Sequence, residues 1–142
     1  MPSFKIFDVA GSGMSAQSVR LNTVASNLAN ADSISGDPNT VYKARHPVFE
    51  AVKASLSQQQ QDGGNAAVHV KGIMESQATP SARYEPGNPL ANADGYVFAP
   101  NVNVVEEMVD MISASRAYQN NVEVMNTAKS LLLKTLQMGQ GS

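Results

Sequence analysis

The longest uninterrupted stretch of the chain, from Asn103 to Met138, contains neither glycine nor proline. Apolar side chains recur in it every seven residues, and further apolar residues fall beside them. The seven-residue series is Val104, Met111, Tyr118, Met125 and Leu132, with Met108, Val122 and Leu136 alongside. Polar residues gather on the opposite face, at Glu106, Ser113, Arg116, Asn120, Glu123, Thr127, Ser130, Lys134 and Gln137. This pattern predicts one amphipathic helix with an apolar stripe.

The expected helix is too long for a compact molecule. About 35 residues at ~1.5 Å per residue give a length of roughly 50 Å, whereas a globule of this chain length has a diameter under about 40 Å. Asn103 and Glu106 fit a capping box at the start of the helix, and Gly139 fits a C-terminal cap. We therefore expect an elongated protein in which most of the apolar stripe needs a partner.

The composition excludes several classes of protein. A net charge of -2 over 142 residues gives no general attraction to nucleic acid or to anionic membranes. Cysteine is absent, which excludes disulfides and thiolate metal sites. The N-terminal apolar run is broken by Asp8 and does not fit a signal peptide, and no run approaches the ~20 residues needed to cross a bilayer. We expect a soluble chain with no nucleic-acid partner and no direct membrane insertion, exported, if at all, without a cleaved signal.

Residues 4–31 form a second helical pattern. Its seam has a seven-residue series and three smaller side chains at the intervening offsets: Phe7, Met14, Leu21 and Leu28, with Ala10, Val24 and Ala31. Gln17 is the one polar residue at a seam position. Gly11 and Gly13 each cost roughly 1 kcal/mol in a helix interior, and we interpret them as sites of close helix packing. A phosphate-binding loop is the alternative, but no strand precedes them and no Lys-Ser/Thr follows.

The N-terminal helix is poor in charge. Arg20 is the only charged residue from Val9 to Ala31, and the other polar positions carry amides and hydroxyls. A solvated helix surface normally carries interspersed lysines and glutamates, whereas the centre of an interface is depleted of charge. A helix buried in a single domain would show the same depletion, but the chain has few large apolar residues to surround it. Packing against other subunits is the favoured interpretation.

Residues 34–100 form a small β-rich insert between the helical segments 1–33 and 101–142. Turn formers end the first helix at 32–39, and residues 41–52 are expected to be extended, with Pro47 at an edge or a bend. A polar loop with the tract Gln58–Gln61 follows, then an alternating strand at 68–75, an irregular segment at 79–89 and a short strand at 95–99. The expected fold class is α+β, mainly α, with the long terminal helices paired in a coiled-coil-like bundle.

The sequence offers no arrangement for catalysis, metal binding or cofactor binding. His46 and His69 lack partners at ligand spacing and are expected on the surface. Asn92 to Gly95 matches part of a calcium loop, but Leu90 stands where the first carboxylate belongs, so we predict a turn. Glu106 and Glu107 lie in the first turn of a helix, where acidic residues favour the helix dipole. No catalytic, metal or cofactor residue is predicted.

Three blocks of sequence resemble a known family. Residues 20–32, Arg-Leu-Asn-Thr-Val-Ala-Ser-Asn-Leu-Ala-Asn-Ala-Asp, and residues 101–129, which contain Ser-Arg-Ala-Tyr-Gln-Asn-Asn-Val, resemble the terminal signatures of flagellar rod and hook proteins. Tyr84-Glu-Pro-Gly-Asn-Pro-Leu-Ala followed by Gly95-Tyr-Val is similar to the proximal-rod members of the flagellar basal-body rod family. The chain departs from shorter-headed members at 34–40 and in its glutamine tract.

The resemblance implies a structural subunit of the bacterial flagellar proximal rod, the drive shaft that crosses the periplasm. It further implies unfolded export through the flagellar type III apparatus without a cleaved signal. The terminal helices of such proteins pair and stack helically around a channel, so the implied partners are copies of the chain, neighbouring rod proteins and the export apparatus. The residues expected at subunit contacts are Phe7, Met14, Leu21, Val24, Asn27, Leu28, Val104, Met108, Met111, Tyr118, Val122, Met125, Leu132 and Leu136.

Two other classes of function stay open on the sequence alone. A coiled-coil adaptor that binds one partner helix would show the same apolar stripes, and a finite complex with a single partner would distinguish it. A small hydrolase using His46 or His69 would be recognised by its turnover.

Overall fold

The computed structural model describes residues 2–53 and 66–141, and the predicted polar loop with the glutamine tract lies outside these residues. Two long helices, α1 (Pro2–Ala29) and α2 (Val104–Gln140), enclose the strands in sequence. The strands are β1 (Arg45–Lys53), β2 (Ala66–Glu75), β3 (Ser81–Tyr84) and β4 (Tyr96–Ala99). The predicted fold class of two terminal helices around a small β-containing insert, mainly helical, is confirmed.

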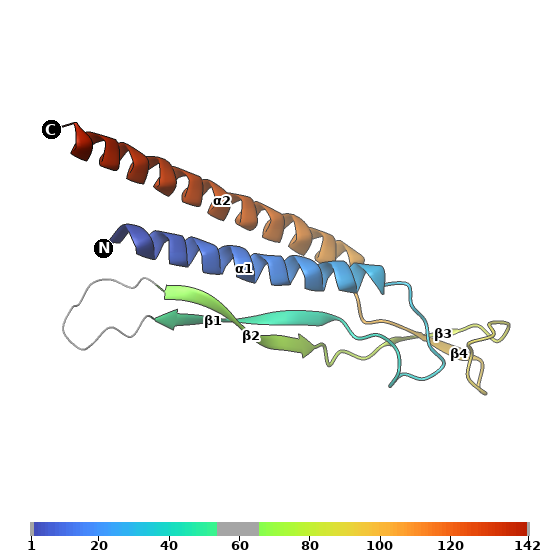
Figure 1. The fold of residues 1–142 in the computed structure, drawn as a ribbon. Coiled ribbons are helices and arrows are strands. Elements are labelled where there is room, and N and C mark those ends of the chain that lie inside the picture. The colour runs from blue at the N-terminus through green and yellow to red at the C-terminus, as the bar shows by residue number, and fades with distance from the viewer. Residues whose placement is uncertain (1, 54–65, 142) are drawn as a thin grey trace.

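The described part of the molecule is elongated, with α1 in the middle. Figure 1 shows α2 along one side of α1 and the β1–β2 hairpin along the other, while β3 and β4 lie beyond the C-terminal end of α1. α1 contacts α2, β1 and β2. α1, which carries fewer charged residues than α2, is therefore the central element that contacts both α2 and the β1–β2 hairpin.

α2 begins directly after Asn103, covers the rest of the stretch that the sequence predicted and continues two residues beyond Met138. The Asn103 side chain caps its N-terminus, since Oδ1 accepts hydrogen bonds from the backbone N–H groups of Val105 and Glu106. The described residues contain no reciprocal bond from the Glu106 side chain, so only half of the predicted capping box forms. The predicted cap at Gly139 is wrong, because the helix continues to Gln140. Gly139 lacks the positive φ of a glycine C-cap.

α1 and α2 are antiparallel neighbours. Asn27 reaches Glu107, Arg20 reaches Asp110, and Gly13 lies against Asn121. A Cβ built on Gly13 would lie 2.9 Å from Asn121 Nδ2, whereas one built on Gly11 would meet nothing within 4 Å. Close helix packing at the glycine pair is therefore confirmed at Gly13 but does not explain Gly11.

The β1–β2 hairpin is antiparallel, from Arg45 opposite Glu75 to Lys53 opposite Ala66. Its register shifts between Val48 and Phe49, directly after Pro47, as expected of a proline at an edge or a bend. The hairpin is twisted under α1 (Figure 1). Its two ends meet α1 through different strands, since Arg45 of β1 bonds to Asn27 while Val68 of β2 donates to Ser12 Oγ at 3.1 Å.

β3 and β4 form a second antiparallel pair, from Ser81 opposite Ala99 to Tyr84 opposite Tyr96. The sequence prediction of an irregular segment at 79–89 missed β3, whose four residues are all exposed and carry no alternating pattern. The predicted turn before β4 is confirmed, because Asn92 Oδ1 accepts bonds from the N–H groups of Asp94 and Tyr96, and Gly95 has a φ of 81°.

The core of the described part is small and consists mostly of short side chains. Its buried apolar residues are Ala10, Ala16, Val24, Val41, Ala44, Val97, Ala99 and Ala114. Large apolar side chains stay exposed along α2 and both sheets, among them Val109, Leu131, Met138 and Ile73. Since a buried large side chain contributes roughly 1.5–3 kcal/mol, the chain by itself leaves much of its available stabilisation unused.

Candidate assembly surface

Asn27 is the polar centre of the fold, with no exposed surface. Its Nδ2 donates to Glu107 Oε1 at 2.9 Å and to the backbone carbonyl of Arg45 at 2.8 Å. Its Oδ1 accepts from Tyr42 Oη and from the backbone N–H of Arg45, both at 2.9 Å. One amide thus makes four hydrogen bonds, which is the full capacity of its two donors and two acceptor lone pairs. It joins α1, the start of β1 and the first turn of α2.

Glu107 is the acidic member of this cluster and is only 4% exposed. Its Oε1 accepts the Asn27 bond, whereas Oε2 has no hydrogen-bond partner among the described residues. The carboxyl group lies in the first turn of α2, where the exposed N–H groups and the helix dipole favour negative charge. Burial raises the pKa of the Tyr42 hydroxyl above 10.0; Arg45 nearby lowers it, while the carboxylates of Glu107 and Glu75 raise it further.

Asn101 joins segments of the insert through side-chain hydrogen bonds, as Asn27 joins α1, β1 and α2. Its Oδ1 accepts from the Ala44 N–H at 2.7 Å, and its Nδ2 donates to the carbonyl oxygen of Ala78, also at 2.7 Å. It therefore holds the chain before β1 and the chain after β2 at the entrance to α2. Ser35 adds a further tie, since its backbone exchanges two hydrogen bonds with that of Phe98 in β4.

Arg20, the lone charge of the central part of α1, is paired across the helix interface. Its Nη2 lies 2.6 Å from Asp110 Oδ1, with both side chains partly exposed. This ion pair and the Asn27–Glu107 bond together link α1 to the first turns of α2.

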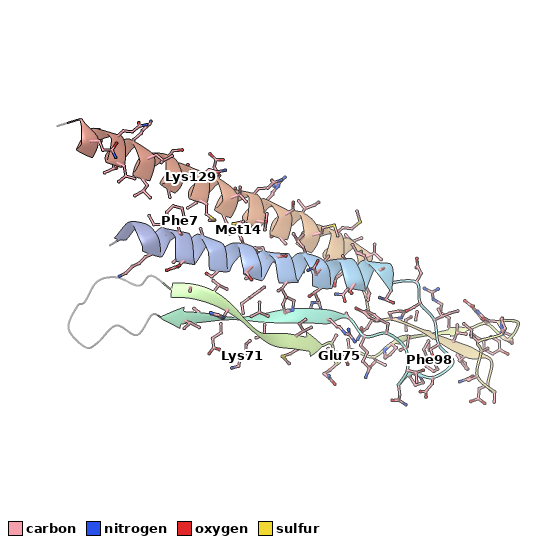
Figure 2. All side chains as sticks on the ribbon, viewed as in Figure 1. Phe7, Met14, Lys71, Glu75, Phe98 and Lys129 are labelled. Atoms are coloured by element: carbon pink, nitrogen blue, oxygen red, sulfur yellow. The ribbon has the colours of Figure 1, made fainter. Side chains whose placement is uncertain are left out.

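The predicted contact residues separate into three groups. Val24 and Asn27 are buried within the chain. Nine are half-buried: Phe7, Met14, Leu21, Leu28, Met111, Tyr118, Val122, Met125 and Leu132. Val104, Met108 and Leu136 are exposed. Figure 2 shows Phe7 and Met14 on the side of α1 that faces α2.

Sequence reasoning placed Ala114 and Ala128 on the apolar flank of α2 but missed the two polar members of its deepest line. Glu107, Ala114, Asn121 and Ala128 are also spaced by seven, and Glu107 and Ala114 are the two buried residues of the helix. The signal was the same period, hidden because an acid and an amide do not look like a core. The seven-residue stripe from Met111 to Leu132 lies beside this line and is half-buried.

Of an apolar patch on the first turns of α2, sequence reasoning found Met108 but missed the three other members. Val105 is 69% exposed and Val109 60%, with Met108 and Ile112 above one half. Shallow hollows lie beside Val109, one lined by Val105, Glu106 and Asp110 and the other by Ile112, Ser113, Arg116, Ala117 and Asn120. We call Val105, Met108, Val109 and Ile112 the outer patch.

Neither histidine takes part in a site. His46 and His69 are exposed on β1 and β2, as predicted. In the part of the chain that the structure describes, no group of three His, Cys, Asp or Glu side chains could hold a metal ion. Likewise, none of the described helices has the length and apolarity that a bilayer crossing requires.

An elongated pair of helices with a small core and exposed apolar stripes defines an assembling structural protein. Comparison with known families agrees with this class. Residues 7–33 match the family described as flagella basal body rod protein, and residues 93–138 match the C-terminal family of flagellar basal body rod FlgEFG proteins.

Full-length relatives narrow the assignment. The chain is 54% identical over 140 residues to the flagellar basal-body rod protein FlgC of Salmonella typhimurium, covering 99% of this chain and 100% of the relative. FlgC of Escherichia coli O157:H7 is 53% identical with the same coverage, and FlgC of Aquifex aeolicus is 40% identical over 96% of this chain and 97% of its own. The chain belongs to the FlgC family of flagellar basal-body rod proteins. It is a structural protein and not an enzyme, which removes the hydrolase alternative.

Proposed function

We propose that the chain is a subunit of the proximal rod and assembles through its terminal helices into a helical, tubular shaft that transmits torque. The observation that carries this proposal is the apolar surface that α2 leaves exposed over residues 104–112 and again over residues 124–138. An exposed apolar surface of this extent on a small chain is typical of an interaction site. A close-packed helical interface resists shear, as a drive shaft must.

The two helices are proposed to pair as one discontinuous helical core, residues 1–33 with 101–142, carrying the insert 34–100 as a separate layer. The two lines of α2 spaced by seven, through Ala114 and through Tyr118, support a coiled-coil-like seam. The Arg20–Asp110 and Asn27–Glu107 contacts fix its register, the attested use of polar groups in such seams.

The predicted contact residues take different roles in this proposal. Val24 and Asn27, being buried in the chain, shape the helix pair and do not reach a neighbour. Val104, Met108 and Leu136 are exposed and available to other subunits. The half-buried residues are expected to pack against α1 on one flank and against neighbouring subunits on the other.

Location and partners follow from the same assignment. The relatives are rod proteins of the flagellar basal body, so we propose a place in the periplasmic part of the rod, with copies of the chain and other rod proteins as neighbours. Passage through the flagellar type III apparatus requires an unfolded chain. The small core supports this route, because a protein that buries few large side chains unfolds at low cost.

The proposed function is tested by a residue that the isolated chain does not need. Leu136 is exposed, so Leu136→Glu should leave the isolated fold unchanged but place an unpaired carboxylate in the subunit contact. We expect the variant to be exported, absent from purified basal bodies and unable to restore swimming. Gln137→Glu, one residue away on the exposed polar side, is the matched control and should assemble. Normal incorporation of Leu136→Glu would exclude this end of α2 from the contact. A finite complex with one partner helix on a sizing column would favour the adaptor alternative.

A further inference from the structure

The two ends of α2 carry exposed apolar surfaces of opposite charge character. Residues 104–115 contain Glu106, Glu107 and Asp110 and no basic residue, whereas residues 124–140 contain Lys129 and Lys134 and no acidic residue. Glu107 is buried and Asp110 is paired with Arg20, so Glu106 is the free acid beside the outer patch. Lys129 and Lys134 are both exposed.

The outer patch has the geometry of a helix-packing hole. Its four members stand at positions i, i+3, i+4 and i+7, which surround one point on a helix surface and form the hole that accepts a side chain of a second helix. All four are exposed, and the hollow lined by Val109, Ile112, Ser113 and Arg116 repeats the same spacing one turn further along α2. The described chain fills neither hole.

The C-terminal end of α2 has the complementary geometry. Leu131 and Met138, 60% and 73% exposed, lie seven residues apart, and Lys134 falls between them on the same face. Gly13 lies against Asn121 in the antiparallel pair, so the first residue of α1, Pro2, comes opposite about Leu132. Beyond that point α2 extends past α1 as the structure describes it (Figure 1). Met138 lies in this extension, and Leu131 lies just before it with its side chain exposed. Both are therefore available as knobs for a second helix, with the positive charge of Lys134 between them.

We propose that the outer patch of one copy receives the Leu131–Met138 end of α2 from a second copy, in a parallel, head-to-tail contact. Lys134 of the incoming helix then lies near Glu106. The contact joins two different surfaces, so it leaves one of each free and can repeat, as heterologous contacts do. A closed two-fold pair would consume both surfaces at once. This inference rests on the proposed function, because an open assembly requires contacts of this kind.

A contact of about two helical turns buries far less than the roughly 1,200 Å² of a stable interface. Because it is so small, the head-to-tail contact forms only together with the other contacts of the assembled rod. The natural chain has no cysteine, so introduced cysteines report the contact without background from the chain itself. Positions 105 and 131 lie 26 residues apart in one helix, about 39 Å at ~1.5 Å per residue, which excludes a disulfide within one copy.

The experiment uses cells whose sole copy of the protein carries Val105→Cys with Leu131→Cys, the positions that a parallel contact brings together, and oxidises their purified basal bodies. We expect a ladder of disulfide-linked multimers of this chain on a non-reducing gel. Each single variant alone should give none, and the two singles expressed together should give the mixed dimer. Glu123→Cys with Leu131→Cys is the control, since Glu123 is exposed on the polar part of the helix outside the patch.

The outcomes separate this inference from the proposed function. Presence of the variant in basal bodies without a ladder overturns the head-to-tail contact and leaves the rod role intact. A band that stops at the dimer in the double variant shows a closed pair instead, and an adduct with a different protein shows that another subunit occupies the patch; both overturn the proposal. If the cysteine pair does not incorporate, Ile112→Cys with Met138→Cys, which the same parallel register brings together, takes its place. Should that pair also stay out, the two single variants Val105→Cys and Leu131→Cys are expressed together with the natural chain, so that the natural copies maintain the rod, and lack of a mixed dimer in the oxidised basal bodies overturns the contact.

Charge reversal provides a second readout. Glu106→Lys should reduce the cross-linked yield severalfold, and adding Lys134→Glu in the same chain should restore it. If neither change alters the cross-linked yield, the pairing of Glu106 with Lys134 is contradicted.

Discussion

Asn27 and Glu107 join α1 to α2 through a hydrogen bond of 2.9 Å in a place that solvent does not reach. The bond links positions 80 residues apart in the sequence, and each partner belongs to one of the two blocks that identify the family. Burying a polar group costs free energy unless a hydrogen bond offsets that cost. Asn27 and Glu107 are both buried, so the bond between them offsets part of the cost for each. Polar side chains thus take part in setting the relation of the two helices, beside the half-buried apolar ones.

The first prediction concerns the Asn27 hub. Asn27→Ala removes four hydrogen bonds and leaves the Glu107 carboxyl group buried with no described partner, so we expect a loss of about 3 kcal/mol in the free energy of unfolding. Urea denaturation followed by circular dichroism measures it. Asn22→Ala, an exposed amide on the same helix, should change stability by less than about 0.5 kcal/mol. Equal effects of the two variants would contradict the role of the hub.

A second prediction follows from the raised pKa of Tyr42. Above pH 10 the unfolded chain loses this proton while the folded chain keeps it, so the unfolded state binds fewer protons and stability falls as the pH rises. The contribution of the Tyr42 hydroxyl is complete below pH 10 and is lost as the pH passes the folded pKa.

Tyr42→Phe tests this dependence. At pH 7 it should cost about 1 kcal/mol, since it removes one hydrogen bond to Asn27 while Asn27 Oδ1 keeps the Arg45 bond. Between pH 9 and 11 the variant should lose stability less steeply than the natural chain. If the free energy of unfolding fell equally with pH for both proteins, Tyr42 would ionise with the same pKa in the folded and the unfolded state.

The sequence predicted the parts of the fold that a long, regular period specifies. An uninterrupted seven-residue pattern defined α2, and the weaker pattern around Gly11 and Gly13 defined α1, because apolar periodicity determines which helix face can be buried. β3 escaped detection because a four-residue, fully exposed strand between prolines has no periodicity. The C-terminal end of α2 was predicted two residues too early. A glycine caps a helix C-terminus when its backbone takes a positive φ, and Gly139 does not take one.

The candidate site was predicted less completely than the fold. The stripe through Tyr118 and Met125 was found, but the burial of Glu107 was not, since it depends on Asn27, which lies 80 residues away in the sequence. Three of the four members of the outer patch were missed for the opposite reason. Val105, Val109 and Ile112 follow helical spacing, but they lie on a side where later turns are polar, so a pattern taken over the whole helix conceals them.

A third prediction separates the two glycines of α1. Gly11→Ala meets no atom within 4 Å and removes the conformational freedom of a helix-interior glycine, so it should stabilise the chain by about 0.5–1 kcal/mol. Gly13→Ala gains the same propensity but pushes a Cβ against the Asn121 amide at 2.9 Å, so we expect net destabilisation. Thermal melts of both variants measure the difference. If Gly13→Ala raised the melting temperature as much as Gly11→Ala, the close approach of the helices would not exist.

The last prediction tests the phase of α2. Met125 is half-buried on the seven-residue stripe, while Glu123, two residues away, is exposed on nearly the opposite side. Met125→Glu would put an unpaired carboxylate into the helix seam at a cost of several kcal/mol, on the order of a buried unpaired charge. Every copy would carry that cost, so the variant should be missing from purified rods and its cells should not swim.

Glu123→Gln is the matched variant for the solvated side and should change stability by less than about 1 kcal/mol. The outer side of α2 can itself meet a further subunit, which would raise the effect of Glu123→Gln but could not lower that of Met125→Glu. Measuring secreted protein and rod-incorporated protein separately distinguishes failed export from failed assembly. Normal assembly of Met125→Glu together with loss of Glu123→Gln from the rod would show that the helix face assigned to the seam is the wrong one.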